Sequence, residues 1–170
     1  SEGFIFSHWS QFPDSSASMS VQVYDNINLS AIFELADQNE SAKIVINEIN
    51  YNSSDLFDVG DWIEIYNNGD HSVQLGGYYF TDENPDHKYM FSDSSTIEPG
   101  SYIVLAQDVE KFSSLFSNVN NLYGSFNFGL SGGGEEISLY DFSNRLIDRV
   151  TYDDEHPWPI EPDGSGPTLE

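Results

Sequence analysis

The sequence predicts an all-β protein, a β-sandwich preceded by a short N-terminal β segment. In the run Asp61–Asn67, Ile63 and Ile65 alternate with larger or charged residues, which is the two-residue period of a strand. Asn68-Gly69 follows directly and indicates a tight hairpin, because both residues tolerate positive φ. Short runs of this kind, separated by turn signals, continue to the end of the chain, as is typical of a sandwich.

The first 40 residues form a unit of their own in this interpretation. Phe4–Phe6, Val21–Tyr24 and Ala31–Glu34 have the composition of short strands, and Pro13–Ser16 is a loop signal between the first two. Three short strands are marginally stable alone. The polar stretch Asp37–Ser41 indicates a linker, so we expect domain boundaries at 1–40 and 41–170.

The second unit is predicted to consist of strands with one helix. Asp108–Phe116 is the helix, with Asp108 as N-cap and apolar residues at helical spacing. Asn52–Gly60 is expected to be an acidic loop and Asp141–Asn144 a hairpin loop. The expected strands are Lys43–Ile49, Asp61–Asn67, Val73–Leu75, Tyr78–Thr81, Lys88–Phe91, Tyr102–Ala106, Phe126–Phe128, Glu136–Tyr140 and Leu146–Tyr152.

The charge balance excludes whole classes of partner. The chain has 29 Asp and Glu against 5 Lys and Arg, a formal net charge of −24, so its field repels nucleic acid and anionic lipid. Solubility or adaptation to salty water explains this charge as well as a cation site does. No cysteine is present, which excludes disulfides and thiolate chemistry. No run approaches the ~20 apolar residues of a membrane span, so we expect no membrane insertion.

Two resemblances to known families follow from blocks of sequence. Gly3–Trp9, Ser20-Val21 and Asn28–Phe33 resemble the end of an internalin-type B repeat, a small β module of bacterial surface proteins. From about residue 43 a second series of blocks follows: Ile46–Ile49, Asp61–Asn67, Leu75–Tyr78, Phe80–Asp82, Pro99–Leu105, Phe128–Ser131, Gly134–Asp141, Asp148–Tyr152 and Trp158-Pro159. In the order and spacing of these blocks the chain resembles the bacterial lamin-tail domain.

The lamin-tail resemblance implies an immunoglobulin-like β-sandwich without enzymatic activity. Bacterial domains of this kind accompany other domains in large secreted or surface proteins, so it implies a secreted or cell-surface location. The family has no general catalytic or cofactor residues to carry over. Because the chain begins at Ser1 rather than Met, we expect it to be a piece of a longer protein. Expected partners are neighbouring domains of that protein, or protein or glycan at the cell surface.

Calcium is the cation that the acidic loops would suit best, although we expect no cofactor. Calcium prefers several oxygen ligands from one loop. The candidate sets are Asp55, Asp58 and Asp61; Asp82, Glu83 and Asp86; and Asp153, Asp154 and Glu155. None has the spacing of an EF-hand loop, and chance clusters are expected in so acidic a chain. A solvated acidic surface is therefore the competing interpretation.

Aromatic residues provide the main alternative function. Exposed aromatic rings on a β-sandwich can stack on sugars, and the candidates are Trp62, Tyr66, Tyr78, Tyr79 and Trp158. In the lamin-tail resemblance, such residues mostly pack in or beside the core. Carbohydrate binding through Trp62, Tyr66, Tyr79 and Trp158 is thus the alternative to an accessory, adhesion or interaction module.

Catalysis and phosphate binding are disfavoured by spacing. His8, His71, His87 and His156 are scattered, and we expect four solvated loop or strand-end residues. Gly129–Gly134 lacks the lysine of a P-loop and the spacing of a nucleophile elbow, so we expect a flexible connection between strands.

Two carboxylates inside predicted strands require a separate explanation. Glu48 and Glu64 would be neighbours if their strands pair, as the carboxylates of a glycosidase must be. We expect them to accept hydrogen bonds from adjacent turns instead.

Overall fold

The chain contains two compact units, Ser1–Glu40 and Ser41–Glu170. The computed structural model describes residues 4–10, 20, 22, 24, 26–35, 43–84 and 86–170. In the part of the chain that it describes, no helix is long and apolar enough to cross a membrane.

The first unit contains one antiparallel strand pair. Strand β1 (Phe4–Trp9) pairs with β2 (Ala31–Leu35), with an irregularity in the register between Phe6 and His8. The backbone N–H of Ser10 extends the pairing by donating to the carbonyl of Ser30 at 2.9 Å. Two of the three expected strands are therefore confirmed.

Three expectations for the first unit fall wholly or partly outside the described residues. The loop Pro13–Ser16 and the linker Asp37–Ser41 lie outside them entirely. Of the expected strand Val21–Tyr24, only Gln22 and Tyr24 are described, and neither is in a strand.

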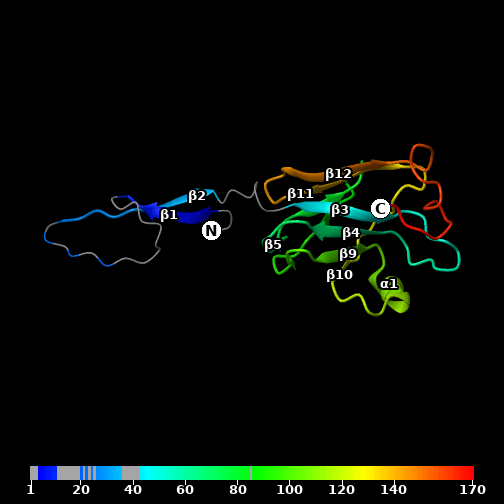
Figure 1. Ribbon diagram of the computed structural model, residues 1–170, viewed down its shortest axis with the longest axis horizontal. Helices are drawn as coiled ribbons and strands as arrows, with labels where there is room; N and C mark the ends of the chain where they lie inside the picture. Colours follow the sequence, from blue (N-terminus) through cyan, green and yellow to red (C-terminus); the bar gives the residue numbers. More distant parts are fainter. Residues whose placement is uncertain are drawn as a thin grey trace. The chain divides into compact units, whose positions relative to one another are not determined.

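The second unit is a β-sandwich of two four-stranded sheets (Figure 1). One sheet has the order β10-β9-β4-β3, and the other has the order β12-β11-β6-β7. The pair β5–β8 forms a small third sheet. The strands are β3 (Ile44–Asn50), β4 (Trp62–Asn67), β5 (Val73–Gln74), β6 (Tyr79–Thr81), β7 (Tyr89–Met90), β8 (Thr96–Ile97), β9 (Tyr102–Ala106), β10 (Leu122–Gly124), β11 (Glu135–Tyr140) and β12 (Leu146–Tyr152).

The core lies between the two sheets. The alternation of Ile63 and Ile65 with other residues in the sequence explains which side chains enter it. Ile63 and Ile65 of β4 are fully buried, and so are Ile137 and Leu139 of β11 in the facing sheet. The neighbouring side chains on β4 point to the outer face of the sheet. Burial of these branched side chains drives the two sheets together, at roughly 1.5–3 kcal/mol for each fully buried side chain.

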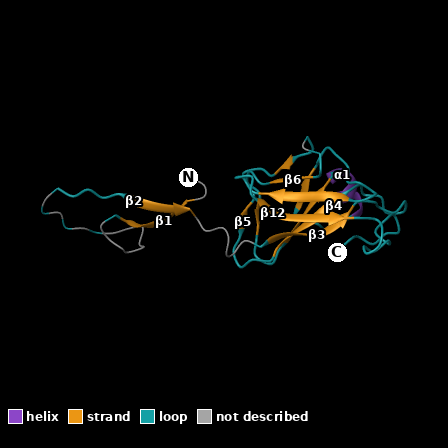
Figure 2. Ribbon diagram, turned by 90° about the horizontal axis from the view of Figure 1, so that it is seen from above, coloured by secondary structure: helices purple, strands orange, loops and turns teal. Residues whose placement is uncertain are grey.

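The single helix of the described residues, α1 (Val109–Leu115), packs on an outer sheet face through Phe112. It is the purple element in Figure 2. As predicted, Asp108 is its N-cap, and its carboxylate accepts the backbone N–H of Lys111 at 2.9 Å. Phe112 is buried against Trp62 in a second apolar cluster outside the main core. The helix also carries the chain from β9 to β10, which is why these two strands pair in parallel.

Three predictions about the second unit were wrong or incomplete. Phe126–Phe128 is irregular rather than a strand. The strand of this region is β10, which was not predicted. The short strand β8 was not predicted at all. Asn68-Gly69 does not close a hairpin, because β4 pairs with β3 and β9 rather than with β5. Instead, the side-chain carbonyl of Asn67 accepts the N–H of Gly69 at 2.9 Å.

The outer edge of β3 is covered by other parts of the unit. Ile49 exchanges both backbone hydrogen bonds with Leu169, each 2.9 Å long. The backbone N–H of Ile46 donates to the carboxylate of Asp148, on β12, at 2.7 Å. These contacts pair N–H groups that an open sheet edge would present to another strand.

Candidate functional site

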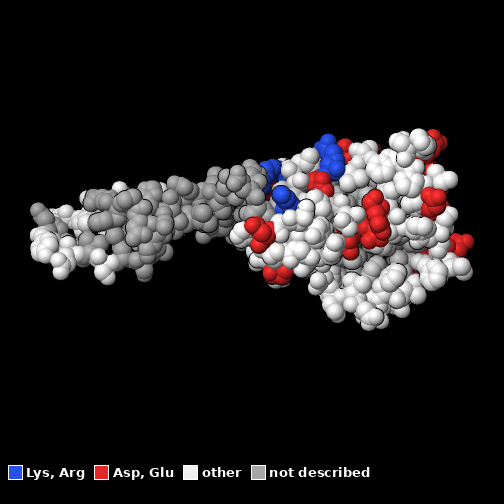
Figure 3. Space-filling model, viewed as in Figure 1, with Lys and Arg blue, Asp and Glu red and all other residues white. Residues whose placement is uncertain are grey.

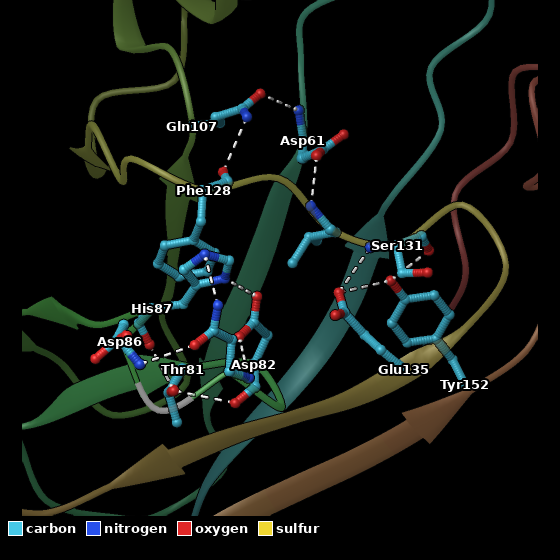
Figure 4. Close-up of polar contacts among 12 residues, drawn as sticks. Asp61, Thr81, Asp82, Asp86, His87, Gln107, Phe128, Ser131, Glu135 and Tyr152 are labelled. Atoms are coloured by element: carbon cyan, nitrogen blue, oxygen red, sulfur yellow. Dashed lines mark hydrogen bonds and ion pairs between the residues drawn. The ribbon is translucent and has the colours of Figure 1, made fainter.

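The β10–β11 connection, residues 125–134, is the part of the unit where polar and ionisable side chains gather (Figure 4). Its apolar side chains Phe126, Phe128 and Leu130 are buried, while Asn127 and Gly129 between them are exposed. A connection that enters the core must satisfy its backbone N–H and C=O groups without a neighbouring strand. Distant side chains provide the partners.

Asp61 and Gln107 hold the first half of the connection. The Asp61 carboxylate accepts the backbone N–H of Leu130 at 2.7 Å. The Gln107 side-chain amide donates to the carbonyl of Phe128 at 2.9 Å. Burial raises the pKa of Asp61 to about 6, against the opposing effect of its hydrogen bond from Leu130.

Glu135 and Tyr152 hold the second half. The Glu135 carboxylate accepts the backbone N–H of Ser131 at 2.8 Å. The Tyr152 hydroxyl lies 2.9 Å from the Ser131 carbonyl and 3.1 Å from the Glu135 carboxylate, and these two acceptors share its single proton. Burial raises the pKa of both Glu135 and Tyr152, and the negative charge of Glu135 raises that of Tyr152 further.

A third contact reaches the connection from the β6–β7 loop. The ring of His87 stacks on Phe128, with centroids 4.9 Å apart and planes 8° apart. The Asp82 carboxylate orients this ring by a 2.6 Å contact with Nδ1, and it also accepts the backbone N–H of Asn84. The expectation of a solvated His87 was therefore wrong, because the ring is half-buried against the core. His71, in contrast, is exposed beside Asp70.

The residues predicted to bind calcium are divided among separate contacts. Asp55 is exposed, Asp58 forms an ion pair with Lys111 at 2.7 Å, and Asp61 points to Leu130. In the second set, Asp82 contacts His87, whereas Glu83 accepts the backbone N–H of Glu136 at 3.1 Å and Asp86 donates its own N–H to Asn84.

Elsewhere on the surface the carboxylates are also dispersed. In the third acidic set, Asp153 accepts the backbone N–H of Glu155 at 3.0 Å. Figure 3 shows the acidic side chains as separate groups on the visible face of the unit. Across the described ranges, no three His, Cys, Asp or Glu residues are arranged to hold a metal ion.

The predicted sugar-binding aromatics occupy four different environments. Trp62 is buried under α1, and Trp158 packs against the main core. Tyr66 stacks on Tyr102 of β9, with centroids 4.4 Å apart. Tyr79 stacks on Tyr140 at 5.0 Å and has the Lys88 ammonium 3.4 Å from its ring centroid. The remaining candidate, Tyr78, is buried. These side chains do not form one platform.

Glu48 and Glu64 are register partners on β3 and β4, as their strand positions suggested. The Glu64 carboxylate accepts the side-chain amide of Asn47 at 2.9 Å, and Glu48 accepts the hydroxyl of Thr168. Burial raises the pKa of Glu64, and the charge of Glu48 adds to this effect. Their hydrogen-bond donors are a strand residue and the C-terminal segment rather than the expected turns.

The comparison with known families identifies the second unit. A family model described as Lamin Tail Domain matches residues 37–154. The chain belongs to the lamin tail domain family. The match ends before Trp158-Pro159, which the sequence resemblance had included, and it lies almost wholly within the second unit. A search of curated proteins found no match. Lamin tail domains are immunoglobulin-like structural and interaction domains that are not known to be catalytic.

Sequence reasoning missed the anchors of the β10–β11 connection. Gln107, Glu135 and Tyr152 were not singled out as anchors. One signal was available in the sequence, because Phe126, Phe128 and Leu130 alternate with small or polar residues and so predict a buried, extended segment. Its partners lie up to 69 positions away in the chain, so no local pattern identifies them.

Proposed function

We propose that this lamin tail domain is a non-catalytic interaction module of a larger secreted or surface protein from a bacterium. The family match carries the proposal, because domains of this kind act through their surfaces. The first unit is then the end of an internalin-type repeat, which adds a second surface module. Adhesion, or docking of neighbouring domains of the parent protein, is the role that we assign.

The carboxylates with raised pKa support a structural use of the ionisable groups. Perturbed carboxylates often indicate catalysis, because burial adjusts them to act as acids or bases. Here the Asp61 and Glu135 carboxylates each accept a backbone N–H of the β10–β11 connection, at 2.7 and 2.8 Å. The buried position of these two carboxylates is explained by their hydrogen bonds, which hold the β10–β11 connection in place.

Carbohydrate binding is the alternative, and its support is weaker. Stacking on sugar needs an accessible ring face. The Tyr79 ring has Tyr140 against it and the Lys88 ammonium at 3.4 Å from its centroid. A glycan-binding module would be retarded on affinity gels that contain polysaccharide, and Tyr79→Ala would abolish the retardation. We expect no retardation of either protein.

Cross-linking on intact cells that produce the parent protein tests the proposed function. A dihydrazide cross-linker used with a triazinium coupling reagent suits this chain. The reagent activates carboxyl groups, the hydrazide displaces the activated oxygen, and the chain has 29 Asp and Glu. We expect cross-links from the second unit to neighbouring domains or to a small set of surface proteins, and removal of the unit by an added, membrane-impermeant protease. Cross-links confined to the unit itself, or protection from the protease, would contradict the proposal.

A further inference from the structure

The β3–β4 loop exposes apolar side chains that do not contribute to the core. Leu56 and Phe57 are neighbours in this loop and retain 85% and 62% of their accessible surface. Val59 lies two positions after Phe57 in the same loop. It is buried under α1, where it joins the apolar cluster around Phe112. The loop is thus anchored beside α1 while its most apolar dipeptide points to solvent.

The end of α1 adds further exposed apolar surface next to this loop. Lys111 of α1 forms an ion pair with Asp58, the residue after Phe57, at 2.7 Å. Leu115 lies four positions after Lys111 and therefore on the same helix face. Figures 1 and 2 place α1 and the β3–β4 loop at the same end of the sandwich. The exposed apolar residues of this region, here called the α1 patch, are Leu56, Phe57, Leu115, Phe116 and Val119.

The α1 patch differs from the isolated exposed apolar residues found on most proteins. Single exposed leucines are ordinary, but five exposed apolar side chains, two of them phenylalanines, on two segments joined by an ion pair are typical of a binding site. Phe116 already rests against Phe112 at a centroid distance of 5.0 Å, which keeps its ring in place at the edge of the helix. A positioned aromatic ring loses little conformational entropy when a partner covers it.

The charges beside the patch define the chemistry of its partner. Asp55, Asp58, Asp108 and Glu110 are exposed in the two segments that form it. Lys111 is the sole cation among residues 52–60 and 107–121, and Asp58 neutralises it. The Lys111 hydrogen bond lowers the pKa of Asp58, which keeps that carboxylate ionised. A partner must therefore combine apolar side chains with flanking positive charge.

We propose that the α1 patch is the docking surface for a basic amphipathic segment of a partner protein. Leucine- or phenylalanine-type side chains of that segment cover Phe57 and Leu115, and its lysines or arginines face the surrounding carboxylates. The same acidic surroundings repel anionic lipid. This inference rests on the proposed function, since it names the surface through which an interaction module would act.

A defined peptide tests the inference in the full chain. The probe is a labelled helical peptide of about 18 residues made of Leu and Lys at helical spacing, titrated by fluorescence anisotropy. We expect saturable binding that weakens as NaCl rises from about 0.05 to about 0.5 M, because salt screens the charges. The same peptide with Glu in place of Lys should not bind. Failure of the Lys peptide to bind overturns the inference.

Matched variants locate the binding surface. We expect Phe57→Ser with Leu115→Ser to weaken binding about tenfold or more, as the loss of central apolar contacts does. The control is Met90→Ser with Leu146→Ser, which removes two exposed apolar side chains far from α1 in sequence and should change affinity less than about twofold. Equal losses in both variants, or no loss in the first, overturn the inference. If a double variant fails to fold, its single substitutions replace it.

Two further experiments distinguish this inference from membrane binding and from the proposed function. Sedimentation with phosphatidylcholine–phosphatidylserine vesicles should leave the protein in solution, and patch-dependent sedimentation would overturn the assignment of a protein partner. If the cross-links on cells are found but the peptide does not bind, the docking role of the α1 patch is wrong and the proposed interaction function stands. If those cross-links are absent, the proposed function itself is contradicted.

Discussion

The β10–β11 connection and the β3–β4 loop are both long and irregular, yet they use their side chains in opposite ways. The connection buries Phe126 and Phe128, and side chains from three other strands or their ends satisfy its backbone. The β3–β4 loop satisfies much of its backbone locally, as where Gly60 donates to the Asp58 carboxylate at 3.0 Å, and leaves Phe57 exposed. An irregular segment thus becomes part of the core only when distant residues replace a strand's hydrogen bonds.

The largest expected difference compares the same substitution in the two segments. Phe128→Ala should lower the free energy of unfolding by about 3–5 kcal/mol, because it leaves a cavity beside Phe80 and His87. Phe57→Ala should change it by less than about 0.5 kcal/mol, because the ring is exposed. Urea unfolding followed by tryptophan fluorescence measures both. Similar values for the two variants would mean that the connection is not part of the core.

A smaller effect concerns pH and the two aspartates of the β3–β4 region. Burial raises the pKa of Asp61 from 3.8 to about 6, so the folded state favours its protonated form. The stabilisation from this group is fully present below about pH 4 and is lost as pH rises through about 6. Asp58 has the opposite sign, since its pKa is lowered and its contribution is lost as pH falls into the acid range.

Asparagine at each position isolates these effects. Asp61→Asn should flatten the fall in stability between about pH 4 and 7 by about 1 kcal/mol, a value reduced because solvent screens the partly exposed carboxyl. Asp58→Asn should change stability only at the acid end. Thermal unfolding at a series of pH values measures stability against pH for both variants. If Asp61→Asn loses stability with rising pH as steeply as the wild type does, another group causes the pH dependence.

The smallest expected effect is that of calcium. The carboxylates of Asp61, Asp82 and Glu83 each accept a backbone N–H of a different segment, so each is already oriented away from a shared ligand position. We expect equal thermal midpoints in calcium, magnesium and chelator at fixed ionic strength, within the roughly 2–4 °C that corresponds to 1 kcal/mol. A calcium-specific rise that Asp82→Asn removes would contradict this and establish the second acidic set as a site.

Sequence patterns predicted the elements whose causes are local. The alternation around Ile63 and Ile65 predicted β4 and the faces of its residues. The Asp108 cap and the spacing of Phe112 predicted α1. In the β11–β12 hairpin, Asp141 accepts the backbone N–H groups of Ser143 and Arg145, which is the expected loop. In α1 and the hairpin loop the capping or turn hydrogen bond lies within a few residues, and in β4 the alternation itself is local.

The failures come from partners that lie far along the chain. The period of two in Phe126–Phe128 reports burial correctly, but whether a buried extended segment is a strand depends on its hydrogen-bond partner, which here is Gln107. Strand β10 was recognisable in principle, because a strand, a helix and an apolar run in succession predict a parallel pair. Strand β8 contains two residues, too few to show any period.

The candidate site was predicted only in part for the same reason. Asp61 was singled out as a calcium ligand because Asp55 and Asp58 are near it in the sequence. The structure directs its carboxylate to Leu130 instead. The density of acidic residues in the sequence therefore did not predict what the Asp61 carboxylate contacts.

The pairing of Ile49 with Leu169 sets a practical boundary for dissecting this unit. A version cut at residue 154, where the family match stops, would lack Leu169 and the hydroxyl of Thr168 that contacts Glu48. The exposed side of β3 would then be free to recruit the same strand of a second molecule. Shortened versions should self-associate as their concentration rises, because residues 155–170 no longer cover this edge.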